Sequence, residues 1–383
     1  MPNKVFPWRS GGRFELLVDS HAYFPAMLEA IQQATHTIEL ELYLISDGQC
    51  AQALVEALSK ASERGLTVRC LFDGFGSLGL GQPLLKALLA AEVQVRFYNP
   101  VSWRRGLRNL YRDHRKLLVI DHQVAFVGGM GATDHFWLPE PSPALWHEVM
   151  VRAKGPVVLD WQRLFDRQWQ ACLTQHAWKP SQALKPPPRP LASEQGWARV
   201  AYADGAQHRD ILAALIQALR GAKIQVWLAT PYFLPTWRVR RLLRKAAKRG
   251  VDVRLLLTGR HTDNPPVRYA GQRYYPKLLK AGVRIYEFQP KFLHLKMVVV
   301  DEWVSIGSCN FDHWNLHFNL DANLEAIDRT LTQQVRTLFT NDFDQSVEVT
   351  LANWQARPRW ERFKQGLWGT LERVVINLFR HDR

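Results

Sequence analysis

The chain has 383 residues, of which 47% are hydrophobic, so it is long enough to form two or three domains with buried cores. It carries 50 Lys and Arg against 35 Asp and Glu, and this net charge of +15 favours polyanionic partners, namely nucleic acid or an anionic membrane. The four cysteines form no CxxC pair, which argues against a disulfide framework and a zinc site, and neither a signal peptide nor a membrane span of about 18 apolar residues is predicted.

In the first half of the chain, helical and strand-like patterns alternate. Apolar residues recur at helical spacing in three segments and in strand-like runs in three others, and strands separated by helices predict crossover connections and a largely parallel sheet. The predicted helices cover 22–34, 50–64 and 82–92, and the predicted strands cover 37–45, 66–74 and 93–99.

The second half repeats this order with similar wording. ASERGLTVRCLFDG at 61–74 resembles AAKRGVDVRLLLTG at 246–259, and LLAAEVQVRFYNP at 88–100 resembles LLKAGVRIYEFQP at 278–290. Self-similarity over half a chain indicates two copies of one structural unit. The predicted fold class is therefore α/β, with one α/β unit used twice.

The predicted domain boundaries follow from this repeat and from the prolines. The first unit covers 1–175, and a Pro-rich linker at 176–195 joins it to a second unit at 196–345, because prolines continue neither a helix nor a central strand. A second Pro-rich insert, FWLPEPSPALW at 136–146, interrupts the first unit. Residues 346–383 form a basic, amphipathic tail.

Each copy contains one His-x-Lys motif, in DHRKLLVID and in HLKMVVVD. The two side chains of each motif, His114 with Lys116 and His294 with Lys296, lie two residues apart and so share one face of a strand. An aspartate follows seven residues after each histidine, at an odd offset that turns it to the other face. We therefore expect Asp121 and Asp301 to anchor the strand ends instead of touching a substrate.

Two histidines and two lysines suit the chemistry of a phosphodiester. Lysines offset the negative charge that repels nucleophiles, one neutral imidazole attacks phosphorus, and a protonated imidazole supplies the proton to the departing alkoxide. The residues suggest no metal ligand set and no cofactor.

The pattern HxKxxxxD followed by GSxN resembles the phospholipase D superfamily. HLKMVVVDEWVSIGSCNFD, NLDANLEAID and YYPKLLKAGVRIYEF, with the opening RFELLVDSHAYFPAMLEAI, are most similar to bacterial cardiolipin synthases of the B type. The resemblance implies two pseudo-symmetric phospholipase D-like α/β/α units around one shared active site, and phosphatidyl transfer between two phosphatidylglycerol molecules through a phospho-histidine.

The resemblance also assigns roles to single residues. The motif residues are the catalytic set, GSxN and its first-copy counterpart bind the substrate phosphate, and two carboxylates orient the histidines. The catalytic set is His114, Lys116, Asp121, His294, Lys296 and Asp301. The phosphate-binding residues are Ser308, Asn310 and Gly129, and the orienting carboxylates are Glu148 and Asp321. By analogy with related phospholipases His114 is the nucleophile and His294 the acid. One position departs from the pattern, because Gly131 stands where relatives usually carry Asn, and a phosphate donor is missing there.

Three basic tracts, at 102–116, at 237–249 and in the tail from 357, indicate contact with anionic lipid. For the tail, an ordinary helix packed on the protein body is an equal alternative, and for 237–249 a solvated helix face is the favoured interpretation. The expected location is the cytoplasmic side of the bacterial inner membrane, as a peripheral protein. The rival functions are a phosphodiesterase acting on nucleic acid, an enzyme hydrolysing phospholipid, and an inactive binding protein. The Trp-rich tail favours lipid over nucleic acid as the partner.

Overall fold

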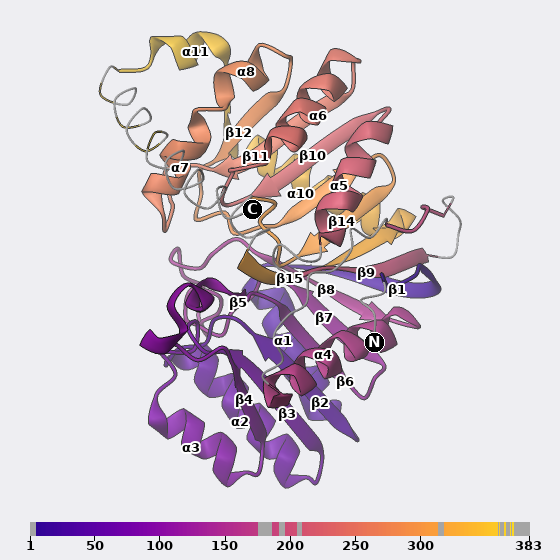
Figure 1. The fold of residues 1–383 in the computed structure, drawn as a ribbon, viewed down its shortest axis with the longest axis vertical. Coiled ribbons are helices and arrows are strands. Elements are labelled where there is room, and N and C mark those ends of the chain that lie inside the picture. The colour runs from indigo at the N-terminus through magenta and orange to yellow at the C-terminus, as the bar shows by residue number, and fades with distance from the viewer. Residues whose placement is uncertain are drawn as a thin grey trace.

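The computed structural model of the chain describes residues 5–174, 186–190, 196–204, 209–312 and 318–358, together with 360, 364, 368 and 370. Figure 1 shows two α/β halves placed one above the other, with the N-terminal half in indigo and purple and the C-terminal half in red to yellow. Their sheets meet edge to edge between β1 and β9, so the described strands form a single sheet.

The N-terminal half contains the first eight strands. They are β1 (Arg9–Val18), β2 (Thr37–Leu42), β3 (Thr67–Asp73), β4 (Gln94–Tyr98), β5 (Arg112–Asp113), β6 (Lys116–Ile120), β7 (Val124–Gly128) and β8 (Val149–Lys154). The helices of this half are α1 (Ser20–Gln33), α2 (Gln49–Glu63), α3 (Gln82–Ala90), the 3₁₀ segment η1 (Trp103–Leu110) and α4 (Val157–Thr174).

The C-terminal half repeats the order. Its strands are β9 (Gly196–Asp204), β10 (Gln225–Thr230), β11 (Asp252–Thr258), β12 (Arg284–Phe288), β13 (Met297–Val300), β14 (Trp303–Gly307), β15 (Asn319–Ile327) and β16 (Ser346–Val349). Its helices are α5 (Asp210–Gly221), α6 (Trp237–Lys248), α7 (Pro265–Gln272), α8 (Tyr275–Leu279), α10 (Arg329–Asp344) and α11 (Leu351–Ala356).

The sheet of each half runs in the same order, which confirms the repeat. From the junction outward the strands are β1-β8-β7-β6-β2-β3-β4 in one half and β9-β15-β14-β13-β10-β11-β12 in the other, with β16 on the outer edge. The sheet is mixed, but the prediction that it is largely parallel was wrong. Among the described strands, those joined by crossover helices, β2-β3-β4 and β10-β11-β12, are the ones that pair in parallel within the two halves. Their other neighbours within each half pair antiparallel, among them β6-β7 and β13-β14, which are connected by short turns.

Helices cover both faces of the sheet and enclose three apolar clusters. One cluster lies under α1, α2 and α3, and a second lies under α5, α6 and α8. The third is shared by the two halves, because Trp161 and Phe165 from α4 join Val335 and Phe339 from α10. Helix α4 also packs on β9, and α10 packs on β1. Each half therefore lends one helix to the core of the other.

The described residues bear on three of the sequence predictions. Most of the linker at 176–195 lies outside them. The tail predicted to begin at 346 begins instead with structure that belongs to the body, since β16 pairs antiparallel with β12 and Trp354 of α11 is buried in the second cluster. Much of the remaining tail lies outside the described residues. Among the described helices, none combines the length and the apolar character needed to cross a membrane.

Candidate active site

The two His-x-Lys motifs lead into equivalent strands, one in each half. His114 precedes β6, whose first residue is Lys116, and His294 with Lys296 directly precedes β13. The leucines that flank His294, Leu293 and Leu295, point the other way into the shared core. His114, Lys116 and His294 line one cavity of about 720 Å³ whose walls come from both halves, and Lys296 is fully buried beside His294. The prediction that the two motifs share a pocket is confirmed.

His114 is held by residues of the opposite half. Its Nδ1 lies 2.9 Å from Oδ1 of Asp321 on β15, and its backbone N–H donates to the carbonyl of Leu320 at 2.9 Å. The hydroxyl of Ser308 donates to the same Oδ1 of Asp321 at 2.7 Å. A carboxylate accepts only, so Nδ1 carries the proton and Nε2 is the nitrogen left for a substrate.

His294 is held in the mirrored way by the first half. Its Nδ1 lies 2.5 Å from Oε2 of Glu148, and its backbone N–H donates to the carbonyl of His147 at 2.8 Å. Gly129 makes room for this carboxylate, because a Cβ at that position would come within 2.0 Å of Oε2 of Glu148. Each imidazole therefore depends on a carboxylate of the other half, and the residue before that carboxylate fixes the motif backbone.

The surroundings keep both imidazoles neutral. Burial, followed by repulsion from Lys116, lowers the pKa of His114 from 6.5 to about 4. Burial, followed by repulsion from Lys296, lowers the pKa of His294 from 6.5 to about 3, and Nζ of Lys296 lies 2.7 Å from Nδ1 of this ring. At pH 7 both rings are therefore neutral, as a nucleophile requires.

The two lysines differ in their partners. Lys116 donates to the carbonyl of His114 at 2.6 Å, and burial together with Lys296 places its pKa well below the ordinary value. Lys296 donates to Oε2 of Glu148 at 3.1 Å; burial lowers its pKa, and Glu148 opposes that change. For Glu148 itself, burial favours the neutral acid, but Lys296 and His294 outweigh burial and leave the pKa of this carboxyl below its usual range.

Asp121 and Asp301 lie at the far ends of their strands, outside the residues that line the cavity. Asp121 accepts backbone N–H groups of Thr35, His36 and Thr37 at 2.7–2.9 Å. Asp301 accepts those of residues 223–225 at 2.9–3.0 Å. The expected anchoring is confirmed, and the assignment of these two aspartates to the catalytic set is corrected, because they cap loops on the other face.

The phosphate-binding set is only partly brought together. Asn310 lines the cavity, whereas Ser308 and Gly129 are not among the described residues that line it, and they support the two carboxylates instead. Gly131 lines the cavity at the position equivalent to Asn310. A Cβ there would lie 3.0 Å from a ring carbon of Phe136 and 3.1 Å from Leu44. The Cβ of an asparagine would therefore press on both neighbours, which would have to shift by a few tenths of an ångström to admit it.

Several aromatic residues of the site were missed by sequence reasoning. The ring centroid of Tyr43 lies 4.9 Å from that of His114, and Tyr43, directly after β2, and Tyr232, two residues after β10, both line the cavity. Phe136 and Trp146 pack on His294 with centroids 5.3 and 4.9 Å away. These two rings open and close the Pro-rich insert, so the insert is a wall of the active site. The aromatic residues at the two ends of the insert were the sequence signal that could have identified it as part of the site.

A buried ion-pair network behind the cavity was also missed. Nδ1 of His147 lies 2.7 Å from Asp19, and its Nε2 lies 3.1 Å from Asp342 of the other half. Lys291 donates to Asp19 at 2.7 Å. Burial disfavours the charged ring, but the two carboxylates outweigh it and raise the pKa of His147 from 6.5 to about 9. The network joins the halves close to Glu148, and no motif letter marked it.

Comparisons with known proteins agree with this geometry. Residues 27–169 and 215–343 match the family model described as cardiolipin synthase, PLD-like domain, once in each half. Cardiolipin synthase B of Salmonella typhi is 35% identical over 90% of this chain and 84% of its own length. The cardiolipin synthase of Halalkalibacterium halodurans is 32% identical over 92% and 69%.

Among solved structures, phosphatidylserine synthase of Haemophilus influenzae has a TM-score of 0.75 and covers 98% of this chain and 96% of its own, at 12% identity. That likeness is one of fold. The family match covers most of the described residues, and the sequence relatives are matched over more than two thirds of their length. The chain belongs to the phospholipase D-like cardiolipin synthase family.

Proposed function

We propose that the enzyme transfers a phosphatidyl group from one phosphatidylglycerol to another, giving cardiolipin and glycerol. The observation that carries this proposal is the pair of imidazoles from opposite halves lining one cavity, each oriented through Nδ1 by a carboxylate of the other half. In-line displacement at phosphorus needs a nucleophile and an acid on opposite sides of one phosphate. The relatives' names supply the substrate class.

In the first step, His114 attacks the phosphorus of the donor lipid. The Nε2 lone pair forms the N–P bond, the P–O bond to the glycerol headgroup breaks, and the leaving oxygen takes a proton from His294. His294 must be protonated to do this, whereas burial and Lys296 lower its pKa to about 3. The phosphodiester brings a negative charge that offsets the repulsion from Lys296, so substrate binding raises that pKa.

In the second step, the headgroup hydroxyl of a second phosphatidylglycerol attacks the phospho-histidine. Its proton passes to His294, the N–P bond breaks, and His114 returns to its neutral form. Lys116, Lys296 and Asn310 offset the charge on the phosphate oxygens in both steps. Asp321 and Glu148 act through the imidazoles, since each sets a tautomer and stabilises the cation that forms.

The partner surface that we propose is an anionic bilayer. Trp103 and Leu107 on η1 are 86% and 65% exposed, and η1 ends at Asn109 and Leu110, which line the cavity. Phe75 is exposed and lines the cavity as well. Aromatic and aliphatic side chains between arginines suit the membrane interface. We place the enzyme peripherally on the cytoplasmic side of the inner membrane.

The test is an assay on vesicles of labelled phosphatidylglycerol, with lipid products separated by mass spectrometry. Cardiolipin with an equal amount of free glycerol is expected from the wild type, and none is expected from His114→Ala. Phosphatidic acid as the main product would mean that the enzyme hydrolyses phosphatidylglycerol instead of transferring its phosphatidyl group. A plasmid-cleavage arm covers the nucleic-acid alternative, and cleavage without any lipid product would overturn the proposal.

A further inference from the structure

Helix α6 carries an unusual concentration of positive charge. Its twelve residues, WRVRRLLRKAAK, include six basic side chains and no acidic one. Val239, Leu243 and Ala246 form the buried face that packs on the sheet. The arginines and lysines therefore stand on the outward faces, and their number exceeds what burial of the helix requires.

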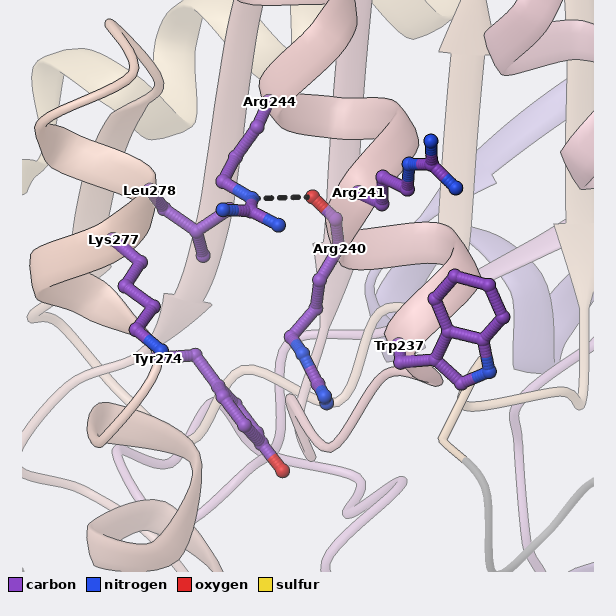
Figure 2. Close-up of a pocket in the computed structure, with 7 residues that line it drawn as sticks. All are labelled: Trp237, Arg240, Arg241, Arg244, Tyr274, Lys277 and Leu278. Atoms are coloured by element: carbon purple, nitrogen blue, oxygen red, sulfur yellow. Dashed lines mark hydrogen bonds between the residues drawn. The ribbon is translucent and has the colours of Figure 1, made fainter.

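Part of this charge lines a groove between α6 and α8. Arg240, Arg241 and Arg244 from α6 and Lys277 from α8 line a space of about 220 Å³. Arg240 and Arg244 lie on the side of α6 that faces α8, whereas the side chains of Arg241 and Trp237 point away from α8 (Figure 2). Figure 2 shows Arg244 between the two helices and Arg240 lying alongside the ring of Tyr274. The guanidinium of Arg240 lies 4.0 Å from that ring centroid and donates to the carbonyl of Pro235 at 2.5 Å. It is therefore positioned before any ligand arrives.

Three of the four basic groups that line this groove have no carboxylate partner within the part of the chain that the structure describes. No carboxylate there lies within 4.0 Å of the side-chain nitrogens of Arg241, Arg244 or Lys277. Neighbouring like charges on a helix destabilise it, and an anion removes that cost. The groove thus has the charge and the shape of a phosphate site, and Trp237, 57% exposed, adds an apolar edge.

The equivalent helix of the other half shows that the fold does not need this charge. Helix α2 also lies between two parallel strands, and its sequence QCAQALVEALSKASE contains two glutamates and one lysine. Lys60 of α2 is paired with Glu56 at 2.6 Å. Two helices with the same place in the fold therefore differ by seven units of formal charge, from −1 for α2 to +6 for α6.

The groove adjoins the active-site cavity along both of its walls. Leu234 lines the cavity, and α6 begins three residues later with Trp237. On the other wall, Val267 of α7 lines the cavity, and Tyr274 follows shortly after that helix ends. Short stretches of chain therefore connect residues of the groove to residues that line the cavity.

We infer that the groove of α6 and α8 binds the phosphate groups of anionic phospholipids in the bilayer surface and is distinct from the catalytic phosphate site. Trp237 lies in the interface, and the arginines hold the lipid headgroups, so that the cavity beside them is kept against the membrane. This inference rests on the proposed lipid substrate, and its test measures binding instead of turnover.

The experiment uses the His114→Ala protein, which binds lipid without consuming it. Vesicles of phosphatidylcholine, with and without 30% phosphatidylglycerol, are sedimented with this protein, with its Arg241→Glu/Arg244→Glu variant, and with a matched control, Lys86→Glu/Lys154→Glu. The control reverses two exposed charges on the N-terminal half. Since each basic residue contributes about 1 kcal/mol at an anionic surface, reversing two charges weakens binding about 10³-fold, and neutralising them weakens it about 30-fold. The control should change it less than about 3-fold.

Equal losses in the groove variant and the control would overturn the inference, because net charge alone would then explain binding. Competition distinguishes other occupants. Inorganic phosphate at 1 mM displacing the vesicles would indicate a free-phosphate site, and a 20-nucleotide DNA bound more tightly than vesicles, with the same loss in the variant, would indicate nucleic acid. Each result contradicts a bilayer site. If charge reversal prevents folding, Arg241→Gln/Arg244→Gln carries the same test, with about half the effect on binding free energy. Cardiolipin formation by the wild type tests the proposed function separately.

Discussion

The two halves share one frame but contribute differently to the site. Both supply a His-Lys pair, a carboxylate for the opposite imidazole and a strand-end aspartate. Among the described residues, the C-terminal half has Asn310 at the cavity where the N-terminal half has Gly131 at the equivalent position, and of the two motif lysines only Lys296 contacts a carboxylate directly. Duplication has therefore preserved what builds the frame, whereas the groups that hold phosphate have become unequal. In the proposed mechanism the phosphate is therefore held mainly from the C-terminal side, which suits attack by His114.

The sharpest way to break this comparison is to remove each imidazole. We expect His114→Ala and His294→Ala to lower kcat by at least about 10⁴-fold, since residues of one catalytic unit fail together. A substrate with a p-nitrophenol leaving group separates their roles, because that group departs without an acid. His294→Ala should then release one equivalent of p-nitrophenol in a burst, and His114→Ala none. A burst from His114→Ala alone would reverse the roles, and His21→Ala, an exposed histidine, is the control.

The second largest loss of activity is expected from changing the two carboxylates that each orient the imidazole of the opposite half. Glu148 serves both His294 and Lys296, whereas Asp321 serves His114 and a serine hydroxyl. We expect Glu148→Gln to lower kcat by about 10³-fold and Asp321→Asn by about 10²-fold, each with a shifted pH profile. Melting curves should change little, because both amides keep the shape. A larger loss of kcat in Asp321→Asn than in Glu148→Gln would contradict the expectation that Glu148 has the larger role.

The phosphate donors should show the asymmetry directly. Asn310→Ala is expected to lower kcat by about 10²-fold, as the loss of one oxyanion donor does. Gly131→Asn should not restore a missing donor, because its Cβ would press on Phe136 and Leu44, and it should destabilise the fold by about 1–3 kcal/mol. Steady-state kinetics and urea unfolding measure both. A faster Gly131→Asn enzyme would show that the N-terminal side can also hold phosphate.

The smallest expected effect concerns the joint between the halves. The pKa of His147 is raised from 6.5 to about 9, so its stabilisation is complete below pH 6.5 and is lost as pH rises through 9. His147→Gln should therefore cost up to about 3 kcal/mol of unfolding free energy at pH 6 and much less at pH 10. Urea unfolding at the two pH values measures this difference. A cost that does not change with pH would mean that His147 is neutral in the folded protein.

Patterns that depend on neighbours in sequence predicted most of the frame. The spacing of His294 and Lys296 placed them on one face, and the odd offset of Asp301 placed it on the other, because strand geometry alone decides this. The repeat also predicted two copies of one unit. The largely parallel sheet was overestimated, since the strands after each motif read like the others and only their short turns reverse the direction.

Contacts between distant segments could not be found in this way. His147, Asp19 and Asp342 come from three parts of the chain, and no spacing rule links them. The aromatic walls from Phe136 and Trp146 fall in a Pro-rich stretch that looked like a plain insertion. The crowding that disfavours Asn at Gly131 depends on Leu44, 87 residues away in sequence. These features are set by packing in three dimensions.

The crossed hydrogen bonds have a genetic consequence. A change at Asp321 is felt first by His114, and a change at Glu148 is felt first by His294, although each pair is separated by a large part of the coding sequence. Neither half can lose its site residues while the other half stays active, because each supplies the carboxylate that orients the imidazole of the other. A gene cut between the two copies would encode two fragments, each of them inactive until the other restores its missing carboxylate.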